Sequence, residues 1–177
     1  MVSSLFLALS LALAGGDAAP VKPVASVDLA RYVGRWYEIA RYPNFFQKSC
    51  AGDVTATYEL KENGRIRVTN RCARVDGSTN EAEGEARPLD GAANARLKVR
   101  FAPAWLGGLP FVWGDYWVIG LADDYRWALV GTPDRKYLWI LSRAPQLADA
   151  DWEAAVAKAR ENGFDTTRLQ RTRQPAT

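Results

Sequence analysis

Residues 54–72, VTATYELKENGRIRVTNRC, decide the fold class of this chain. The first seven and the last seven of these residues alternate apolar with polar side chains, which is typical of strands that bury one face. Asn63-Gly64 between them is a hairpin turn sequence. If Leu60 faces Ile66, then Tyr58 faces Val68. This stretch therefore predicts an antiparallel hairpin.

The two cysteines of the chain, Cys50 and Cys72, flank this hairpin. In the register above, Val54 faces Cys72, so the residues just before the first strand return close to Cys72. An even number of cysteines in an exported protein favours a structural disulfide. Two free thiols or a redox pair are the alternatives.

The pattern of short strands and turns continues along most of the chain. Turn residues such as Asp76-Gly77 and Asp90-Gly91 separate the candidate strands. Eight short strands in succession predict an all-β fold, an eight-stranded antiparallel up-and-down barrel without free sheet edges. The other six strands are expected at residues 34–41, 82–87, 95–101, 116–121, 127–131 and 137–143.

One C-terminal helix follows the strands, with Asp149 as the expected N-cap and Gly163 just past its end. Its apolar stripe is made by Trp152, Ala155, Val156 and Ala159. We expect this helix on the outside of the barrel, where the first strand meets the eighth, because the first, seventh and eighth strands are apolar on both faces. The residues expected to point outward there are Tyr37, Ile39, Ala128, Val130, Leu138 and Ile140. On the middle strands one face is charged or polar and should face water; Lys98 and Arg100 are the last residues of this face along the chain.

Alternation predicts which side chains point into the barrel. Small residues on one wall, Ala82, Gly84 and Ala86, leave room opposite several aromatic residues, so we expect a ligand cavity; close packing of the aromatic rings is the alternative. The candidate ligand-binding residues are Tyr58, Val68, Asn70, Ala86, Val99, Phe101, Trp127, Leu129 and Trp139. Ala40 and Leu141 are also expected inside.

The N-terminus reads as a targeting segment. Residues 1–14 carry an apolar run of signal-peptide length, too short to span a bilayer, and residues 15–27 read as a linker. The barrel domain is then expected over residues 28–177. A buried N-terminal helix is the alternative, and because residues 1–4 carry no Lys or Arg, the recorded start is also open to question.

Composition excludes several kinds of site. The 177-residue chain contains seven tryptophans and no histidine, which rules out a Ser-His-Asp triad and histidine-ligated metals. Its net charge of +3 is dispersed, so we expect no nucleic-acid partner. We expect no cofactor and no metal.

Three short segments resemble the signature motifs of the lipocalin family. Gly34 and Trp36 match the first signature, Asp123 with Tyr125 the second, and the segment ending at Arg143 the third. All three fall where the strand count needs them, and the resemblance covers almost the whole mature chain. Within the family the chain is similar to the bacterial Blc-like outer-membrane lipoproteins and to apolipoprotein D.

This resemblance implies roles for individual residues. Trp36 should close one end of the barrel and Arg143 should pack across it, while Tyr58 and Trp139 should line the cavity. The implied function is to carry or store fatty acids, lysophospholipids or similar amphiphiles in the lipid maintenance of the cell envelope, without catalysis. The alternatives are an enzyme that uses Glu38 as a buried acid, with a structural carboxylate as the simpler interpretation, and a protein-interaction module.

The loops at the other end of the barrel should form its mouth. These are residues 42–53, 73–81, 102–115 and 132–136, and the third is strongly apolar, with Trp105 and Trp113. We expect residues 102–114 to contact a membrane surface or an acyl chain, with a dimer contact as the alternative. Asn70, Tyr58 and Arg41 are the candidates for holding a head group near the rim, although alternation places Arg41 outside.

The lipidated cysteine of the bacterial lipoproteins is replaced here, since the matching stretch is Leu13-Ala14-Gly15-Gly16. We therefore expect an exported protein that is periplasmic or secreted, with association with the outer membrane as the alternative. We expect it to be a monomer or a weak homodimer.

Overall fold

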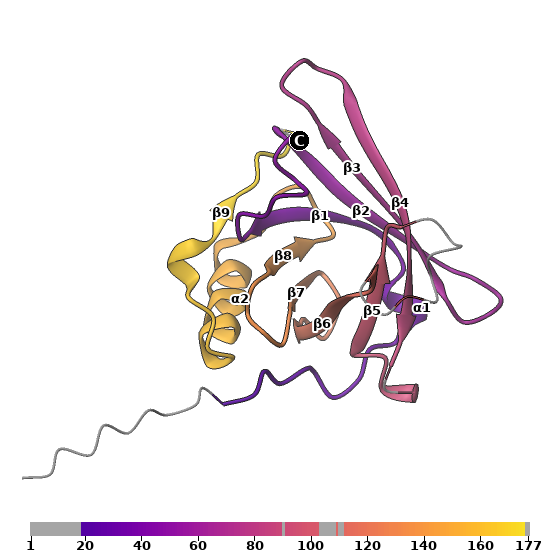
Figure 1. The fold of residues 1–177 in the computed structure, drawn as a ribbon. Helices are drawn as coiled ribbons and strands as arrows, with labels where there is room; N and C mark the ends of the chain where they lie inside the picture. Colours follow the sequence, from indigo (N-terminus) through magenta and orange to yellow (C-terminus); the bar gives the residue numbers. More distant parts are fainter. Residues whose placement is uncertain (1–18, 90, 103–108, 110–111, 176–177) are drawn as a thin grey trace, which may run out of the picture.

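The described part of this computed structural model, residues 19–89, 91–102, 109 and 112–175, folds into one antiparallel sheet that closes on itself (Figure 1). Strand β1 pairs with both β2 and β8, so eight strands form a closed barrel, as predicted. The two-residue strand β9 extends the sheet beside the end of β1. The strands are β1 Gly34–Arg41, β2 Gly52–Leu60, β3 Ile66–Ala73, β4 Thr79–Pro88, β5 Arg96–Arg100, β6 Gly114–Leu121, β7 Trp127–Gly131, β8 Leu138–Ser142 and β9 Gln170–Arg171.

The β2–β3 hairpin has the predicted register. Leu60 pairs with Ile66 and Tyr58 with Val68, and the ladder is regular as far as Thr55. It then shifts between Gly52 and Thr55, where Asp53 adopts a left-handed conformation. The β3–β4 hairpin projects beyond the body of the barrel (Figure 1).

Helix α2, Asp149–Glu161, packs on the outside of the barrel, as expected, but it lies against β6 and β7 and not over the seam between β1 and β8, so its expected position is wrong. Ala155, Val156 and Ala159 are buried there, and Gly163 follows the helix with a positive φ, as predicted. The expected N-cap is wrong by one residue: Ala148 holds that position and makes no side-chain cap, so Asp149 is the first helical residue. A carboxylate in the first turn still interacts favourably with the helix dipole.

The short helix α1, Leu29–Tyr32, and the segment before it lie against the closed end of the barrel. Val21 and Val27 are buried, and the Val24 amide donates to the Val118 carbonyl. Residues 19–27, expected as part of a linker, are thus fixed to the barrel, whereas residues 1–14, the expected signal peptide, lie outside the described residues. None of the described helices has the length and apolar character that a membrane span requires.

Candidate ligand-binding cavity

A cavity of about 700 Å³ occupies the barrel interior, within the range of small-molecule sites. Its mouth lies between the β1–β2 loop, the start of β6 and the β7–β8 turn, as expected from strand alternation. The structure brings together seven of the nine candidate ligand-binding residues on its wall: Tyr58, Val68, Asn70, Ala86, Val99, Phe101 and Trp139. In the described part of the chain, the side-chain amide of Asn70 makes no hydrogen bond and is open to a ligand.

Trp127 and Leu129 do not line this cavity, so their expected inward orientation is wrong. Both belong to the cluster beneath α2, whereas Ala128 and Val130 point into the barrel. The pairing of β7 with β8 explains this orientation, because Val130 lies opposite Trp139, which faces the cavity. Because both faces of β7 are apolar and buried, alternation alone had no means of separating inside from outside.

Two further predicted side-chain orientations are wrong because β1 contains a bulge. The pairing with β8 shifts between Glu38 and Ala40, so Ile39 is the extra residue. Ala40 consequently joins the outer cluster instead of pointing inward. Arg41 lies on the same side as Glu38 instead of being an outward surface charge, because its Nη1 reaches Glu38 Oε1 at 2.9 Å.

The closed end of the barrel is built around Trp36, which is fully buried. Its indole Nε1 donates to the Tyr32 carbonyl, and the Arg143 guanidinium lies 3.8 Å from the centre of a Trp36 ring. Arg143 also donates to the carbonyl oxygens of Arg35, Arg31 and Tyr32. A cation–π contact and three hydrogen bonds therefore fasten the end of β8 across the barrel floor.

The other signature residues hold α1 on this floor. The Tyr125 hydroxyl accepts a hydrogen bond from the Asp28 amide, and the Arg31 guanidinium lies 4.0 Å from the centre of the Tyr125 ring. Arg31 also donates to the Asp123 carbonyl. Gly34 has a φ of 97° and a Cβ there would meet Arg143 at 3.3 Å, which explains the glycine.

Tyr58 lies at the inner end of the cavity, not near the rim where a head group was expected. Its ring is 5.8 Å from that of Tyr32, next to Trp36. The hydroxyls of both tyrosines are 2.9 Å from the Tyr116 hydroxyl. Burial raises the pKa of Tyr58 to about 12 and the pKa of Tyr32 and Tyr116 well above the usual value, so all three are neutral phenols.

Part of the room expected at Gly84 is occupied by Phe101. A Cβ at Gly84 would lie 2.7 Å from Phe101 Cδ1. The Phe101 ring therefore lies over the glycine backbone at the cavity edge and remains 44% exposed. The small residue on β4 makes space for an aromatic wall side chain as well as for a ligand.

Aromatic side chains surround the mouth. Trp139 stacks on Tyr137 with ring centres 5.8 Å apart, and Phe46 packs against both. Phe45 and Phe46 are 70% and 50% exposed. The rim is thus apolar and open to solvent, which is the environment that the acyl part of an amphiphile would meet first.

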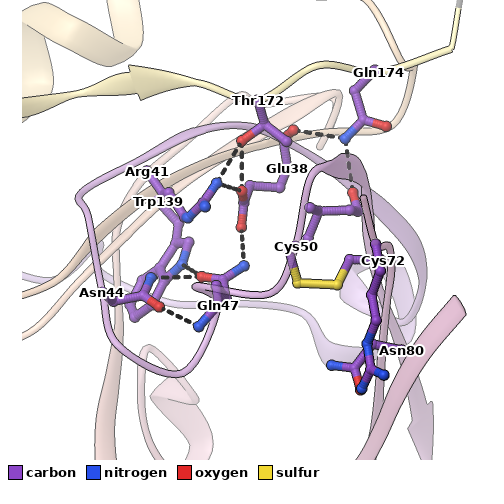
Figure 2. The surroundings of a disulfide bond; sticks show 12 residues. Glu38, Arg41, Asn44, Gln47, Cys50, Cys72, Asn80, Trp139, Thr172 and Gln174 are labelled. Carbon is purple, nitrogen blue, oxygen red and sulfur yellow. Dashed lines mark hydrogen bonds and ion pairs between the residues drawn. A yellow bond between two sulfur atoms is a disulfide. The ribbon is translucent and has the colours of Figure 1, made fainter. Parts of the chain in front are cut away.

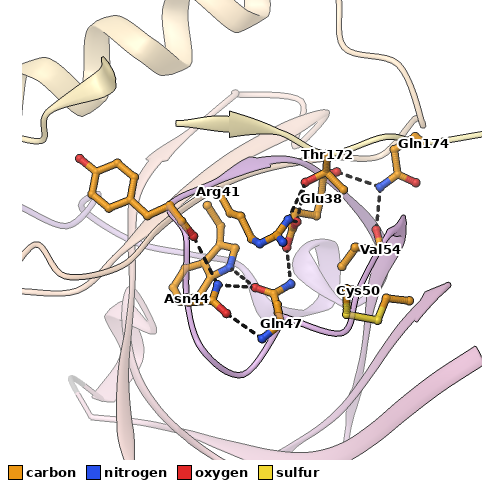
Figure 3. A network of polar contacts seen from close by, with 11 residues as sticks. Glu38, Arg41, Asn44, Gln47, Cys50, Val54, Thr172 and Gln174 are labelled. Atoms are coloured by element: carbon orange, nitrogen blue, oxygen red, sulfur yellow. Dashed lines mark hydrogen bonds and ion pairs between the residues drawn. A yellow bond between two sulfur atoms is a disulfide. The ribbon is translucent and has the colours of Figure 1, made fainter. Parts of the chain in front are cut away.

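Glu38 is the centre of a polar network beside the mouth (Figure 3). Its carboxylate accepts hydrogen bonds from Arg41, Gln47 and Thr172, and Gln47 in turn accepts one from the Trp139 indole at 3.2 Å. The carboxylate is therefore held by three donors, as expected of a structural group. The network joins β1, the mouth loop and the C-terminal segment.

The disulfide between Cys50 and Cys72 is formed, as predicted (Figure 2). It ties the end of the loop after β1 to β3, close to the Glu38 network. Cys50 and Cys72 also line the cavity. Nearby, Gln174 donates to the carbonyl oxygens of both Glu38 and Val54, so the C-terminal segment bridges β1 and β2.

Two side chains expected in contact with solvent or membrane are buried instead. Trp113 lies with its rings 4.5 Å and 5.1 Å from the guanidinium carbons of Arg87 and Arg100. Arg100, expected to face water, is buried and pairs with Glu85 at 3.0 Å. Trp105 lies outside the described residues.

Several cavity residues were not predicted as such. Tyr116 shares a strand face with the buried Val118, and alternation along β6 was the signal that would have placed it inside. Tyr32 and the mouth residues Phe45 and Phe46 lie in a short helix and a loop, where no alternation exists. No group of His, Cys, Asp and Glu side chains among the described residues is arranged to hold a metal ion.

Comparison with known proteins identifies the family. The model of the lipocalin-like domain matches residues 27–174. The chain is 42% identical over 156 residues to temperature-induced lipocalin-1 of Arabidopsis thaliana, covering 87% of this chain and 83% of that protein. It is 40% identical over 156 residues to the outer membrane lipoprotein Blc of Escherichia coli K12, covering 88% and 84%.

Similarity extends to animal proteins. Apolipoprotein D of Macaca fascicularis is 36% identical over 155 residues, covering 83% of this chain and 77% of that protein. Insecticyanin of Manduca sexta superimposes with a TM-score of 0.68 at 20% identity, covering 90% of this chain and 87% of that chain, which shows the shared fold. The chain belongs to the lipocalin family.

Proposed function

We propose that this lipocalin binds and carries or stores amphipathic ligands, fatty acids or lysophospholipids, in its barrel cavity. The cavity that carries this proposal is about 700 Å³, closed at one end, and lined mostly by apolar side chains. Each buried methylene of an acyl chain contributes roughly 0.8 kcal/mol, so such a site favours long chains without needing many polar contacts.

We also propose that the protein is not an enzyme. Glu38, the candidate acid, is occupied by Arg41, Gln47 and Thr172 and sits in a network that shapes the mouth. To act as an acid, Glu38 would have to carry a proton and present it to a substrate, so at least one of these three donors would have to give way.

Export is the proposed localisation, to the periplasm or out of the cell, in support of lipid maintenance in the envelope. The Cys50–Cys72 disulfide supports an oxidising compartment. The relatives named outer membrane lipoprotein Blc support a place in the cell envelope.

We propose that the mouth contacts a membrane surface through residues 102–114. Trp113 is buried, so its side chain does not take part in this contact. Leu109 and the neighbouring Phe101 are exposed, and Phe45 and Phe46 stand on another mouth loop. These side chains would let a bound acyl chain pass between bilayer and cavity without crossing water. We propose a monomer or weak homodimer as the working form.

Tryptophan fluorescence of delipidated protein titrated with lysophosphatidylcholine tests the carrier function. Trp139 lines the cavity and should respond to the ligand, whereas Trp152 lies on α2, outside the barrel. We expect a saturable change at one ligand per chain that is reduced in Trp139→Phe and retained in Trp152→Phe. Absence of a saturable change with any amphiphile would exclude the carrier function.

A further inference from the structure

Three tyrosine hydroxyls form a short hydrogen-bonded chain on the cavity floor. The Tyr116 hydroxyl is central, 2.9 Å from the hydroxyls of Tyr32 and Tyr58. Within the described residues these three side-chain oxygens make no other hydrogen bond. All three residues line the cavity. The floor is therefore a polar patch at the end of an otherwise apolar container.

A count of the hydroxyl protons shows that the hydrogen bonding of the three tyrosines is incomplete. Each neutral phenol carries one hydroxyl proton, so the three tyrosines have three donors, and their two mutual hydrogen bonds use two of them. The raised pKa values keep all three hydroxyls protonated around neutral pH. Whichever direction the chain runs, one O–H remains without an acceptor among the described residues.

The unused donor belongs to a group that faces the cavity. Val68 and Ala86 on the adjacent walls are apolar and offer it no side-chain acceptor. A buried donor without an acceptor is costly, so the floor is most stable when an oxygen atom from a ligand or a water molecule completes the chain.

The polar patch suits a neutral oxygen better than a charged head group. Arg143, the basic side chain that acts electrostatically on Tyr32 and Tyr58, packs on Trp36 and donates to three backbone carbonyls. A phosphate or carboxylate brought to the floor would lose its water for neutral hydroxyls only, which is costly for an ion. The charged end of an amphiphile therefore stays at the mouth.

We propose that the three tyrosines form a subsite for a neutral hydroxyl or keto oxygen at the inner end of the ligand. This inference rests on the proposed carrier function and narrows its ligand class to acyl chains that are oxygenated near the end remote from the head group. The oxygen accepts the unused O–H, and a ligand hydroxyl can also donate to a tyrosine oxygen.

The test compares palmitic acid with ω-hydroxypalmitic acid, which differ only by one terminal hydroxyl. Both acids displace a fluorescent fatty acid from the delipidated full chain. We expect the hydroxylated acid to bind at least as tightly as palmitic acid, because its hydroxyl exchanges water for the tyrosine chain. Preference for palmitic acid by about tenfold or more, as an apolar floor would give, overturns the subsite without recourse to any variant.

The matched variant replaces all three residues, Tyr32→Phe, Tyr58→Phe and Tyr116→Phe, because any single replacement still leaves an unused hydroxyl proton. The rings are retained, and removal of all the partners of a hydrogen-bonded group is far less destabilising than removal of one. The ratio of the two affinities should shift by roughly tenfold or more toward palmitic acid.

Tyr42→Phe is the control, since its hydroxyl donates to the Asp165 carbonyl outside the barrel. It should leave the affinity ratio unchanged. If neither acid displaces the fluorescent probe from the wild-type protein, the carrier function itself fails. If both bind and the triple variant keeps the wild-type ratio, the carrier function stands and the tyrosine subsite is refuted.

Discussion

Removing the Cys50–Cys72 disulfide should destabilise the protein by a predictable amount. The bridge joins residues 22 apart in sequence. Closing a loop of this size lowers the entropy of the unfolded chain, which stabilises the folded protein by roughly 3 kcal/mol. For a chain of this length, such a loss lowers the melting temperature by about 6 to 12 °C. Alanine is the replacement of choice because Cys72 is only 3% exposed, so a hydroxyl there would be buried.

The assay is equilibrium unfolding in denaturant of the wild type and the double variant Cys50→Ala with Cys72→Ala, each with and without reductant. Reductant should lower the stability of the wild type toward that of the variant and leave the variant unchanged. Unfolding free energies that agree within about 1 kcal/mol between oxidised wild type and variant would refute the loop-entropy reasoning.

Three other perturbations test the fold. Trp36→Ala should cost about 3–5 kcal/mol of unfolding free energy because it empties the buried barrel floor; a loss below about 1 kcal/mol in denaturant unfolding would contradict this. Gly131→Val should cost about 1–3 kcal/mol by the same measurement, since its Cβ would lie 2.7 Å from Phe164 Cζ. An unchanged midpoint would show that the segment after α2, which carries Phe164, yields freely. Burial raises the pKa of Glu85, but hydrogen bonds from Arg100 and two other basic side chains hold it at about 2, below the ordinary 4.5. The stabilisation is therefore present above pH 4.5 and lost as the pH falls toward 2, so the stability difference between wild type and Glu85→Gln should shrink over that range, and a pH-independent difference would count against the ion pairs.

The strands and their order were predictable from the sequence because turn residues and alternation agree along most of the chain. The β2–β3 hairpin even has the predicted register, since its Asn63-Gly64 turn fixes which residues face each other. The disulfide followed from that register. The resemblance added the floor, where Trp36 and Arg143 pack as expected.

Side-chain direction failed where alternation carries no information. Trp127 and Leu129 lie on a strand that is buried on both faces, and only the pairing with β8 shows which face is inside. The bulge at Ile39 reverses the direction of every residue after it in β1, including Ala40 and Arg41. Such a bulge has no marker in this sequence.

The polar groups of the cavity depend on contacts between distant segments. Tyr32 comes from α1 and Tyr116 from β6, 84 residues apart, so their hydrogen bond is visible only after the barrel has closed. The same is true of Glu38, whose partner Thr172 lies 134 residues away.

Filling the cavity tests the central claim most directly. Ala56 lines the cavity from β2, and Ala56→Trp would place an indole in the space assigned to the ligand, with Ala144→Trp on the exposed surface as the control. Isothermal titration of the delipidated proteins with lysophosphatidylcholine should give one site per chain in the wild type and the control, and an affinity lower by roughly tenfold or more in Ala56→Trp. Equal binding by Ala56→Trp and wild type would show that the ligand does not occupy the barrel.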